Sequence, residues 1–326
     1  MGTKRAAMTI TTAAVATLAT LGAPAGALAA SPAPAVTMGA ASQVSYAGAV
    51  LSGTVNPRGG ATTYYFQYGP TRAYGLQTPV AGAGSGTVAV PVSATLAGLA
   101  PVTVYHFRLV ALNSAGAISG ADRTFKTAAI PLSLQILGAP NPVAYGQPTV
   151  IEGTLSGTRN ASQAVVLQEN PFPYTQGFLD VGNPELTSAT GGFSFPVLGL
   201  TASTEFRVIT TTKVPVVSPI LIEDVAVSAT IQTRPSRRRH HVRVFGTVTP
   251  NVEGMRVEIL RVVNGHATRV ATTFTRALSA SRARYSVIIR RPRRGAIYEA
   301  LVRVTNGAQT SAYTPAVFVR GRHRRR

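Results

Sequence analysis

A short apolar strand that ends in Gly-Thr and a turn recurs three times along the chain. The glycines of the three copies are Gly53, Gly153 and Gly246, which lie 100 and 93 residues apart. Recurrence at one domain length indicates a series of similar modules rather than one large fold. The 326 residues of the chain are enough for three such modules, each with its own core.

A second landmark follows each glycine by 52 residues, at Tyr105, Glu205 and Tyr298. Apolar and polar residues alternate near these landmarks, as at 64–68, and no helical period persists beyond the N-terminal apolar run. Alternation at period two with aromatic and β-branched residues predicts half-buried strands. We therefore expect an all-β chain of three tandem immunoglobulin-like or fibronectin type III β-sandwich domains, with closed barrels as the alternative.

The first module carries a more specific motif, in which Leu99 and Pro101 precede Tyr105. This spacing lets a tyrosine hydroxyl reach a backbone group at the preceding corner, as in the tyrosine corner of immunoglobulin-like sandwiches. With the segments Gly53-Thr-Val-Asn-Pro57 and Asn113-Ser-Ala-Gly116, residues 42–127 resemble a fibronectin type III domain of the kind common in secreted proteins of high-GC bacteria. The second and third modules resemble generic immunoglobulin-like sandwiches.

The N-terminus has the pattern of a secretory signal peptide. Lys4 and Arg5 precede an apolar run that ends at Ala27-Leu28-Ala29, and an uncleaved membrane anchor is the alternative interpretation. Because later apolar runs are short, we expect no transmembrane segment in the mature chain. The expected organisation is a signal peptide at 1–30, a Pro/Ala-rich leader at 31–41, a fibronectin type III-like domain at 42–128, an immunoglobulin-like sandwich at 129–228, an Arg-rich immunoglobulin-like sandwich at 229–319 and a basic tail at 320–326. We also expect 220–233 to form one long strand region that makes a stiff junction.

Catalytic motifs are missing from the sequence. The chain has no cysteine, which excludes a thiolate metal site and a cysteine nucleophile. It also lacks a nucleophile elbow, a phosphate-binding loop and a paired-histidine metal motif. His240 and His241 are adjacent, so on a strand they point to opposite faces and cannot chelate one metal together. We therefore expect a non-enzymatic protein without cofactor or metal.

Arginine is concentrated in the last module. From residue 234 onward there are 21 arginines and three acidic residues, in a chain with a net charge of +20. Guanidinium groups bind phosphate, sulfate and carboxylate in a bidentate manner. Strand alternation predicts several of these arginines on the solvent face. The candidate polyanion contacts are Arg237, Arg238, Arg239, Arg243, Arg256, Arg290 and Arg303.

The partner that we expect is an anionic polymer of the cell envelope or another protein, in a secreted or envelope-associated location. Specific nucleic-acid recognition is not expected, because no aromatic residues interleave with these arginines. Three alternatives remain: a solvating role for the arginines, a passive spacer or accessory of a secreted enzyme, and a carbohydrate-binding protein. A carbohydrate site would need an exposed aromatic platform, for which the candidates are Tyr64, Tyr65, Tyr68 and Tyr74.

Overall fold

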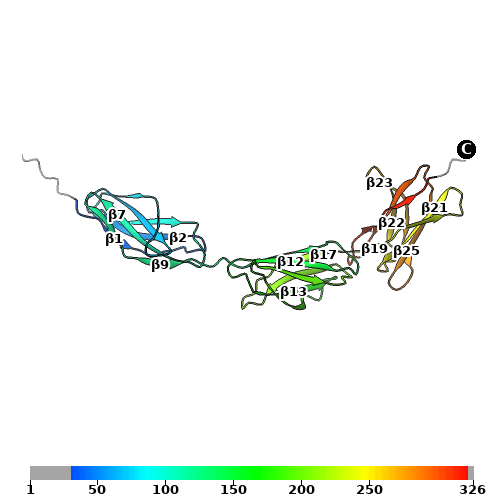
Figure 1. The fold of residues 1–326 in the computed structure, drawn as a ribbon, viewed down its shortest axis with the longest axis horizontal. Coiled ribbons are helices and arrows are strands. Elements are labelled where there is room, and N and C mark those ends of the chain that lie inside the picture. The colour runs from blue at the N-terminus through cyan, green and yellow to red at the C-terminus, as the bar shows by residue number, and fades with distance from the viewer. Residues whose placement is uncertain (1–30, 322–326) are drawn as a thin grey trace, which may run out of the picture. The chain divides into compact units, whose positions relative to one another are not determined.

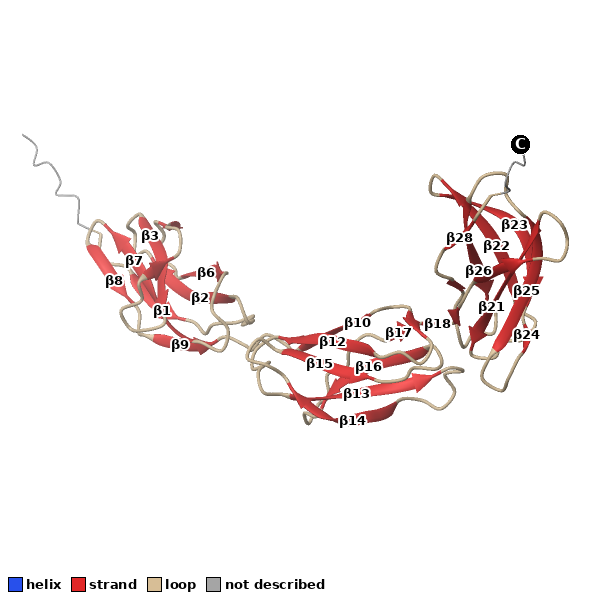
Figure 2. Cartoon of the chain, turned by 45° about the vertical axis from the view of Figure 1, so that its right-hand side comes forward, coloured by secondary structure: helices blue, strands red, loops and turns tan. Residues whose placement is uncertain are grey.

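A computed structural model describes residues 31–321 of the chain, and the ordered elements are strands alone (Figures 1 and 2). The residues up to Ala128 form one compact unit and those from Ala129 onward form another. Within the described part of the chain, no helix is long and apolar enough to span a membrane. The expected signal peptide and residues 322–326 of the expected basic tail lie outside the described residues.

The first unit is a sandwich of two antiparallel sheets. One sheet has the order β1 (Ala35–Met38), β2 (Ala49–Asn56) and β6 (Val90–Leu96). The other has the order β4 (Leu76–Gln77), β3 (Thr62–Gly69), β7 (Val104–Asn113) and β8 (Gly116–Ser119), with β5 (Ala81–Gly84) on β3 and β9 (Arg123–Lys126) on β7. Leu51, Phe66 and Phe107 are completely buried between the sheets. The expected all-β sandwich is confirmed.

The expected leader at 31–41 contains a strand of this sandwich. Residues of β1 pair with β2 from Ala35 opposite Asn56 to Met38 opposite Gly53. Met38 is buried in the core, and Val36 packs against the same core. The expectation of a separate leader is therefore corrected, because the alternation of Val36 and Met38 is that of a half-buried strand.

The second sandwich begins the second unit. One sheet has the order β10 (Ser133–Ala139), β12 (Thr149–Ser156) and β15 (Gly192–Val197). The other has the order β14 (Leu179–Leu186), β13 (Ala164–Pro171), β16 (Thr204–Thr210) and β17 (Leu221–Glu223). A short parallel pair joins β11 (Val143–Ala144) to β18 (Val225–Ala226). The core between the two sheets includes Ile151, Leu167 and Phe206.

The third sandwich has a separate hydrophobic core around Val244, Val257 and Ile259. Its first sheet has the order β19 (Ser228–Ala229), β21 (His241–Thr249), β25 (Ala283–Arg290) and β24 (Arg276–Ala277), with β20 (Gln232–Pro235) also on β21. Its second sheet has the order β23 (His266–Phe274), β22 (Arg256–Val263), β26 (Ala296–Arg303) and β27 (Ala312–Tyr313), with β28 (Val317–Val319) also on β26. The chain is therefore a tandem of three β-sandwiches.

The glycine of each repeated Gly-Thr is required by a close backbone approach. A Cβ atom added at Gly153 would overlap the carbonyl oxygen of Gln135 on the preceding edge strand, and one added at Gly246 would overlap that of Thr230. At Gly53 a Cβ would come within 2.8 Å of the carbonyl oxygen of Thr37. The repeat therefore marks where a neighbouring segment comes so close to the strand that only a residue without a side chain fits.

The expected long strand at 220–233 is wrong. The segment is broken into four short strands: β17 pairs with β16, β18 pairs with β11, and β19 and β20 both pair with β21. The core changes from the second to the third sandwich between Val225 and Val227. Because the pairing partner changes from β16 to β11 to β21 along the segment, it does not continue as one strand.

Candidate functional site

The outer face of the β20-β21-β25-β24 part of the third sandwich brings arginines from four strands together. Arg234 of β20 pairs with Arg243 of β21, which pairs with Ile288 of β25. Farther along, Arg284 of β25 pairs with Arg276 of β24. In β21 and β25 the alternate residues, such as Val244 and Tyr285, are buried, so the arginines lie on the side of the sheet that faces away from the core. Figure 2 shows β21, β25 and β24 in this sandwich.

This face is hollowed into a groove of about 1020 Å³, which we call the arginine groove. Its volume is at the upper end of the range found for small-molecule pockets, about 300–1,000 Å³. Five arginines line it, and no acidic residue does. The charged and apolar side chains that define the arginine groove are Arg234, Arg243, Arg276, Arg282, Arg284, Phe245, Phe274, Leu278 and Ile288.

The expected contact residues are distributed over several places in the third sandwich. Arg237, Arg238 and Arg239 are exposed in the turn between β20 and β21. Arg243 lines the arginine groove. Arg290 is exposed at the other end of β25, where it pairs with His241 and lines a second hollow of about 400 Å³ with Arg261 and Arg293.

Arg256 and Arg303 are exposed, but they do not share this face with Arg243. They lie on β22 and β26 of the opposite sheet, and both contact the buried carboxylate of Glu258. Arg256 Nη2 lies 2.5 Å from Glu258 Oε1, and Arg303 Nε lies 3.2 Å from Glu258 Oε2. Arg269 Nη1 adds a third contact at 3.3 Å. These guanidinium groups already have a carboxylate partner.

The charge state of Glu258 follows from these contacts. Desolvation raises the pKa of its carboxyl group, but the hydrogen bond from Arg303 and the positive charge of Arg256 outweigh that effect. The pKa therefore lies below its usual value, and the group stays ionised. Arg256, Arg269 and Arg303 thus form a local ion cluster that fixes Glu258.

Sequence reasoning missed most of the arginine groove. Arg276, Arg282 and Arg284 come from β24, β25 and the turn between them, and Phe274 lies at the end of β23 in the other sheet. The alternation of Arg284, Ser286 and Ile288 along β25 was a signal that these residues share a face. Which strands lie beside that face depends on long-range pairing, which the alternation does not specify.

Most of the candidate tyrosines for a carbohydrate platform are used in packing. Tyr64 and Tyr68 pack against the core of the first sandwich. Tyr74 is buried, and the guanidinium of Arg108 lies 4.7 Å from the centre of its ring. Three of the four rings therefore contribute to packing, and Tyr64, Tyr65 and Tyr68 are only partly exposed.

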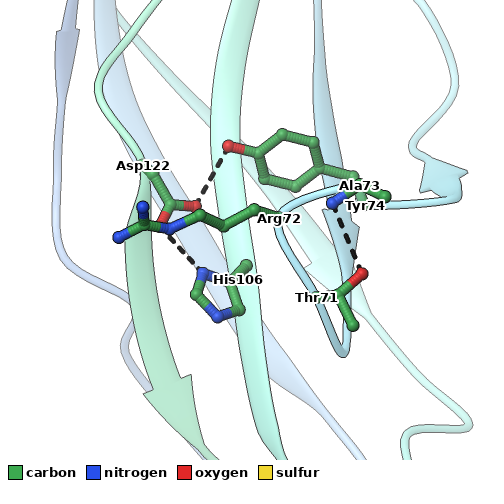
Figure 3. A network of polar contacts seen from close by, with 6 residues as sticks. All are labelled: Thr71, Arg72, Ala73, Tyr74, His106 and Asp122. Carbon is green, nitrogen blue, oxygen red and sulfur yellow. Dashed lines mark hydrogen bonds and ion pairs between the residues drawn. The ribbon is translucent and has the colours of Figure 1, made fainter.

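Tyr74 instead belongs to a polar network in the first sandwich, which Figure 3 shows. Its hydroxyl donates to Asp122 Oδ1 at 3.0 Å, and His106 Nδ1 contacts Asp122 Oδ2 at 2.8 Å. Arg72 Nε lies 3.5 Å from the same oxygen. Desolvation raises the pKa of Asp122, but the hydrogen bonds from His106 and Tyr74 and the charge of Arg72 outweigh it and leave the pKa below its usual value.

This network connects two loops to a strand rather than presenting a reactive group. Asp122 precedes β9, His106 lies on β7, and Tyr74 lies in the turn between β3 and β4. The nearby hydroxyl of Thr71 accepts a hydrogen bond from the amide of Ala73 in the same turn. Nucleophilic catalysis needs a nucleophile held beside the base, and both oxygens of Asp122 are used to hold the loops. The network therefore stabilises the first sandwich.

The tyrosine motif of the first sandwich has the geometry of a tyrosine corner. The hydroxyl oxygen of Tyr105 accepts a hydrogen bond from the backbone amide of Ala100 at 3.0 Å. Leu99 is buried in the same core, and Pro101 lies next to the corner. The bond fixes the chain as it enters β7.

No protein-family model matches the sequence, and no curated protein matches it either. Solved structures similar to the chain are tandem-domain proteins. The FN1-FN3 domains of chicken CNTN1 are 13% identical over 89% of this chain and 99% of that one, with a TM-score of 0.32. Domains A168-A170 of titin are 15% identical over 88% and 99%, with a TM-score of 0.40. A tetra-tandem repeat from the extending region of a large adhesion protein is 15% identical over 88% and 74%, with a TM-score of 0.25. Since these TM-scores are all below 0.5, the fold assignment depends on the sheets described above.

Proposed function

We propose that this chain is an exported, non-enzymatic bacterial protein that acts by contact or spacing at the cell envelope. In this proposal the signal peptide is removed, and the boundaries of the three domains follow the tandem sandwiches. The third sandwich binds an anionic polymer through its arginines. The other two sandwiches act as a spacer.

The observation that carries this proposal is the set of arginines without acidic partners on one face of the third sandwich. Among residues 31–321, the ion pairs of this sandwich all involve Glu258. The five arginines of the arginine groove make no ion pair with a carboxylate within the same range. A protein surface with charges of one sign attracts a polymer of the opposite charge, and the counterions of the polymer are released on binding.

The proposal is tested by retention of the full chain on an immobilised anionic polymer. We expect the chain to bind at low salt and to elute as sodium chloride is raised, because counterion release makes such binding salt-dependent. A neutral dextran matrix of the same density is the control and should not retain it. Absence of retention at about 50 mM salt, where electrostatic binding is strong, would reject the proposal.

A passive spacer is the second candidate function, and one observation favours it. The second and third sandwiches are joined by backbone hydrogen bonds, from Ser203 N to the oxygen of Ala308 at 2.7 Å and from Thr310 N to that of Val225 at 2.8 Å. Such a junction resists bending. A spacer would keep its location in the cell after the exposed arginines of the third sandwich are replaced by glutamine, whereas a polymer-binding protein would be released.

A further inference from the structure

We propose that the arginine groove is the binding site of the third sandwich and that its ligand is an anionic polysaccharide. This inference rests on the proposed function and specifies it further. Binding takes place on one hollowed face, where the sugar rings of the ligand contact the lining of the arginine groove.

The charge of the arginine groove favours an anion with several charged groups. Arg234 and Arg243 lie side by side at one end, and Arg276 and Arg284 lie side by side at the other. On β21, Arg243 is four residues from Thr247, the partner of Arg284. At about 3.4 Å per residue the two arginine pairs are about 14 Å apart along the strands. A chain with repeated charges can contact both pairs, whereas a single small anion can contact only one.

The lining of the arginine groove also includes apolar side chains, which lie among polar ones such as Gln232 and Ser286. Phe245 is half-buried, and the guanidinium of Arg234 lies 5.2 Å from the centre of its ring. Phe274 is 57% exposed and Leu278 is 47% exposed. Exposed apolar side chains that are rimmed by charged residues mark a site of interaction. The flat C–H face of a pyranose ring suits the open ring of Phe274, and its carboxylate or sulfate groups suit the guanidinium groups.

Other anionic polymers fit this combination less well. Single-stranded nucleic acids bind proteins on a series of aromatic rings that stack successive bases, and here Arg234 already lies over Phe245. An acidic peptide would pair with the arginines but has no flat apolar face for Phe274. The polysaccharide is therefore the class that uses both the charges and the apolar side chains.

The test measures affinity of the full chain for alginate, which is a polyuronate, and for polyglutamate, single-stranded DNA and dextran. The groove variant is Arg243→Gln with Arg284→Gln. The matched control is Arg261→Gln with Arg294→Gln, which removes the same charge from exposed sites of the same sandwich outside the arginine groove. We expect the groove variant to bind alginate about tenfold more weakly or worse, since each charge-assisted hydrogen bond contributes more than about 1 kcal/mol. The control should change less than about threefold.

A third variant tests the sugar contact separately from the charge. Phe274→Ala should weaken alginate binding by several fold and leave polyglutamate binding unchanged. Because Phe274, Arg243 and Arg284 are not part of the core, all variants should keep the melting temperature of the unmodified chain.

The possible results separate the two proposals. If the unmodified chain binds no anionic polymer, the proposed function and this inference both fail. If the groove and control variants lose affinity equally, binding depends on the total positive charge of the third sandwich and not on the arginine groove. The inference then fails and the proposed function stands. If polyglutamate or single-stranded DNA binds as tightly as alginate, or if Phe274→Ala weakens all polymers alike, the polysaccharide assignment is wrong.

Discussion

At the scale of single residues, the stability of the first sandwich depends on polar contacts at its corners. Tyr105 satisfies the amide of Ala100 where the chain turns into β7, and Asp122 holds two loops through Tyr74 and His106. An unsatisfied backbone donor costs more than a hydrogen bond gains. Each of these contacts therefore contributes more to the free energy of unfolding than its position near the surface suggests.

Replacing Tyr105 by phenylalanine tests the corner. Tyr105→Phe keeps the buried ring but leaves the Ala100 amide without its acceptor, so we expect a loss of about 1–2 kcal/mol in the free energy of unfolding. Urea denaturation followed by tyrosine fluorescence measures it. Tyr46→Phe, at a residue that is 46% exposed, is the control and should have no effect. An equal response of the two variants would contradict this role.

A buried carboxyl group gives the second sandwich a pH-dependent stability. Glu223 is completely buried; its Oε1 accepts a 3.4 Å hydrogen bond from Thr149 Oγ1, and its Oε2 has no partner among the described residues. Desolvation and the neighbouring charge of Asp224 raise its pKa to about 7. Because the folded pKa is above the unfolded one, the protonated form is favoured in the fold, and stability is lost as pH rises from about 4.5 to about 7.

The variant Glu223→Gln removes this titration. We expect it to be more stable than the unmodified chain above pH 7, by about 2–3 kcal/mol, and equal to it near pH 4. Thermal unfolding at a series of pH values measures the difference. The exposed Glu152→Gln should show no such difference. A constant offset between Glu223→Gln and the unmodified chain across the whole pH range would exclude titration of Glu223 as the cause.

At the scale of elements, the repeated Gly-Thr marks the place where a neighbouring segment comes too close to the strand for a side chain to fit. Gly246 lies where any Cβ would overlap the carbonyl oxygen of Thr230. The backbone there is held by a hydrogen bond from Tyr285 Oη to the same oxygen at 2.6 Å. Desolvation of the Tyr285 hydroxyl raises its pKa, so it remains a donor.

Gly246→Ala is expected to push the backbone at Thr230, between β19 and β20, away from β21 and to lower the stability of the third sandwich by about 1–3 kcal/mol, the usual cost of overpacking. Chemical denaturation measures the loss. Gly86→Ala is the control, because a Cβ at Gly86 would meet no atom within 4 Å. If Gly246→Ala is as stable as the control, the close approach is not what requires the glycine.

At the scale of the whole molecule, the second and third sandwiches are joined within one compact unit by the loop at 306–310. Gln309 Nε2 donates to the oxygen of Thr201 at 2.8 Å, and Thr310 N donates to that of Val225 at 2.8 Å. The loop thereby contacts the second sandwich while β26 and β27, on either side of it, belong to the third. We infer that the two sandwiches resist independent motion.

Gln309→Ala removes one of these bonds and should loosen the junction. We expect the amides of Ser203 and Thr310 to exchange hydrogen severalfold faster, as the loss of about 1 kcal/mol predicts, while amides in the middle of β13 and β22 keep their rates. Hydrogen exchange read by nuclear magnetic resonance resolves these sites. Gln147→Ala, at an exposed position, serves as the control. Unchanged rates at Ser203 and Thr310 would show that Gln309 does not hold the junction.

The sequence by itself determined the architecture, because strand alternation and the Gly-Thr repeat are local properties. Period-two patterns predicted buried side chains such as Phe66, Val257 and Ile259, although Glu258 and Leu260 of β22 are buried as well. The spacing of the three Gly-Thr glycines predicted the number of sandwiches. The strand at 35–38 was missed, since four residues with one polar side chain among three apolar ones give too short a pattern to recognise.

Only the tertiary structure decided which arginines act together. Alternation shows that Arg243 and Arg303 both face away from the core, but it does not show that they lie on opposite sheets. The position of Glu258, which binds Arg256 and Arg303, and the pairing that brings Arg234, Arg276 and Arg284 to one groove both depend on contacts between strands far apart in sequence. Hydrogen-bond register between strands determines such neighbours, and one strand's residues do not specify its partner.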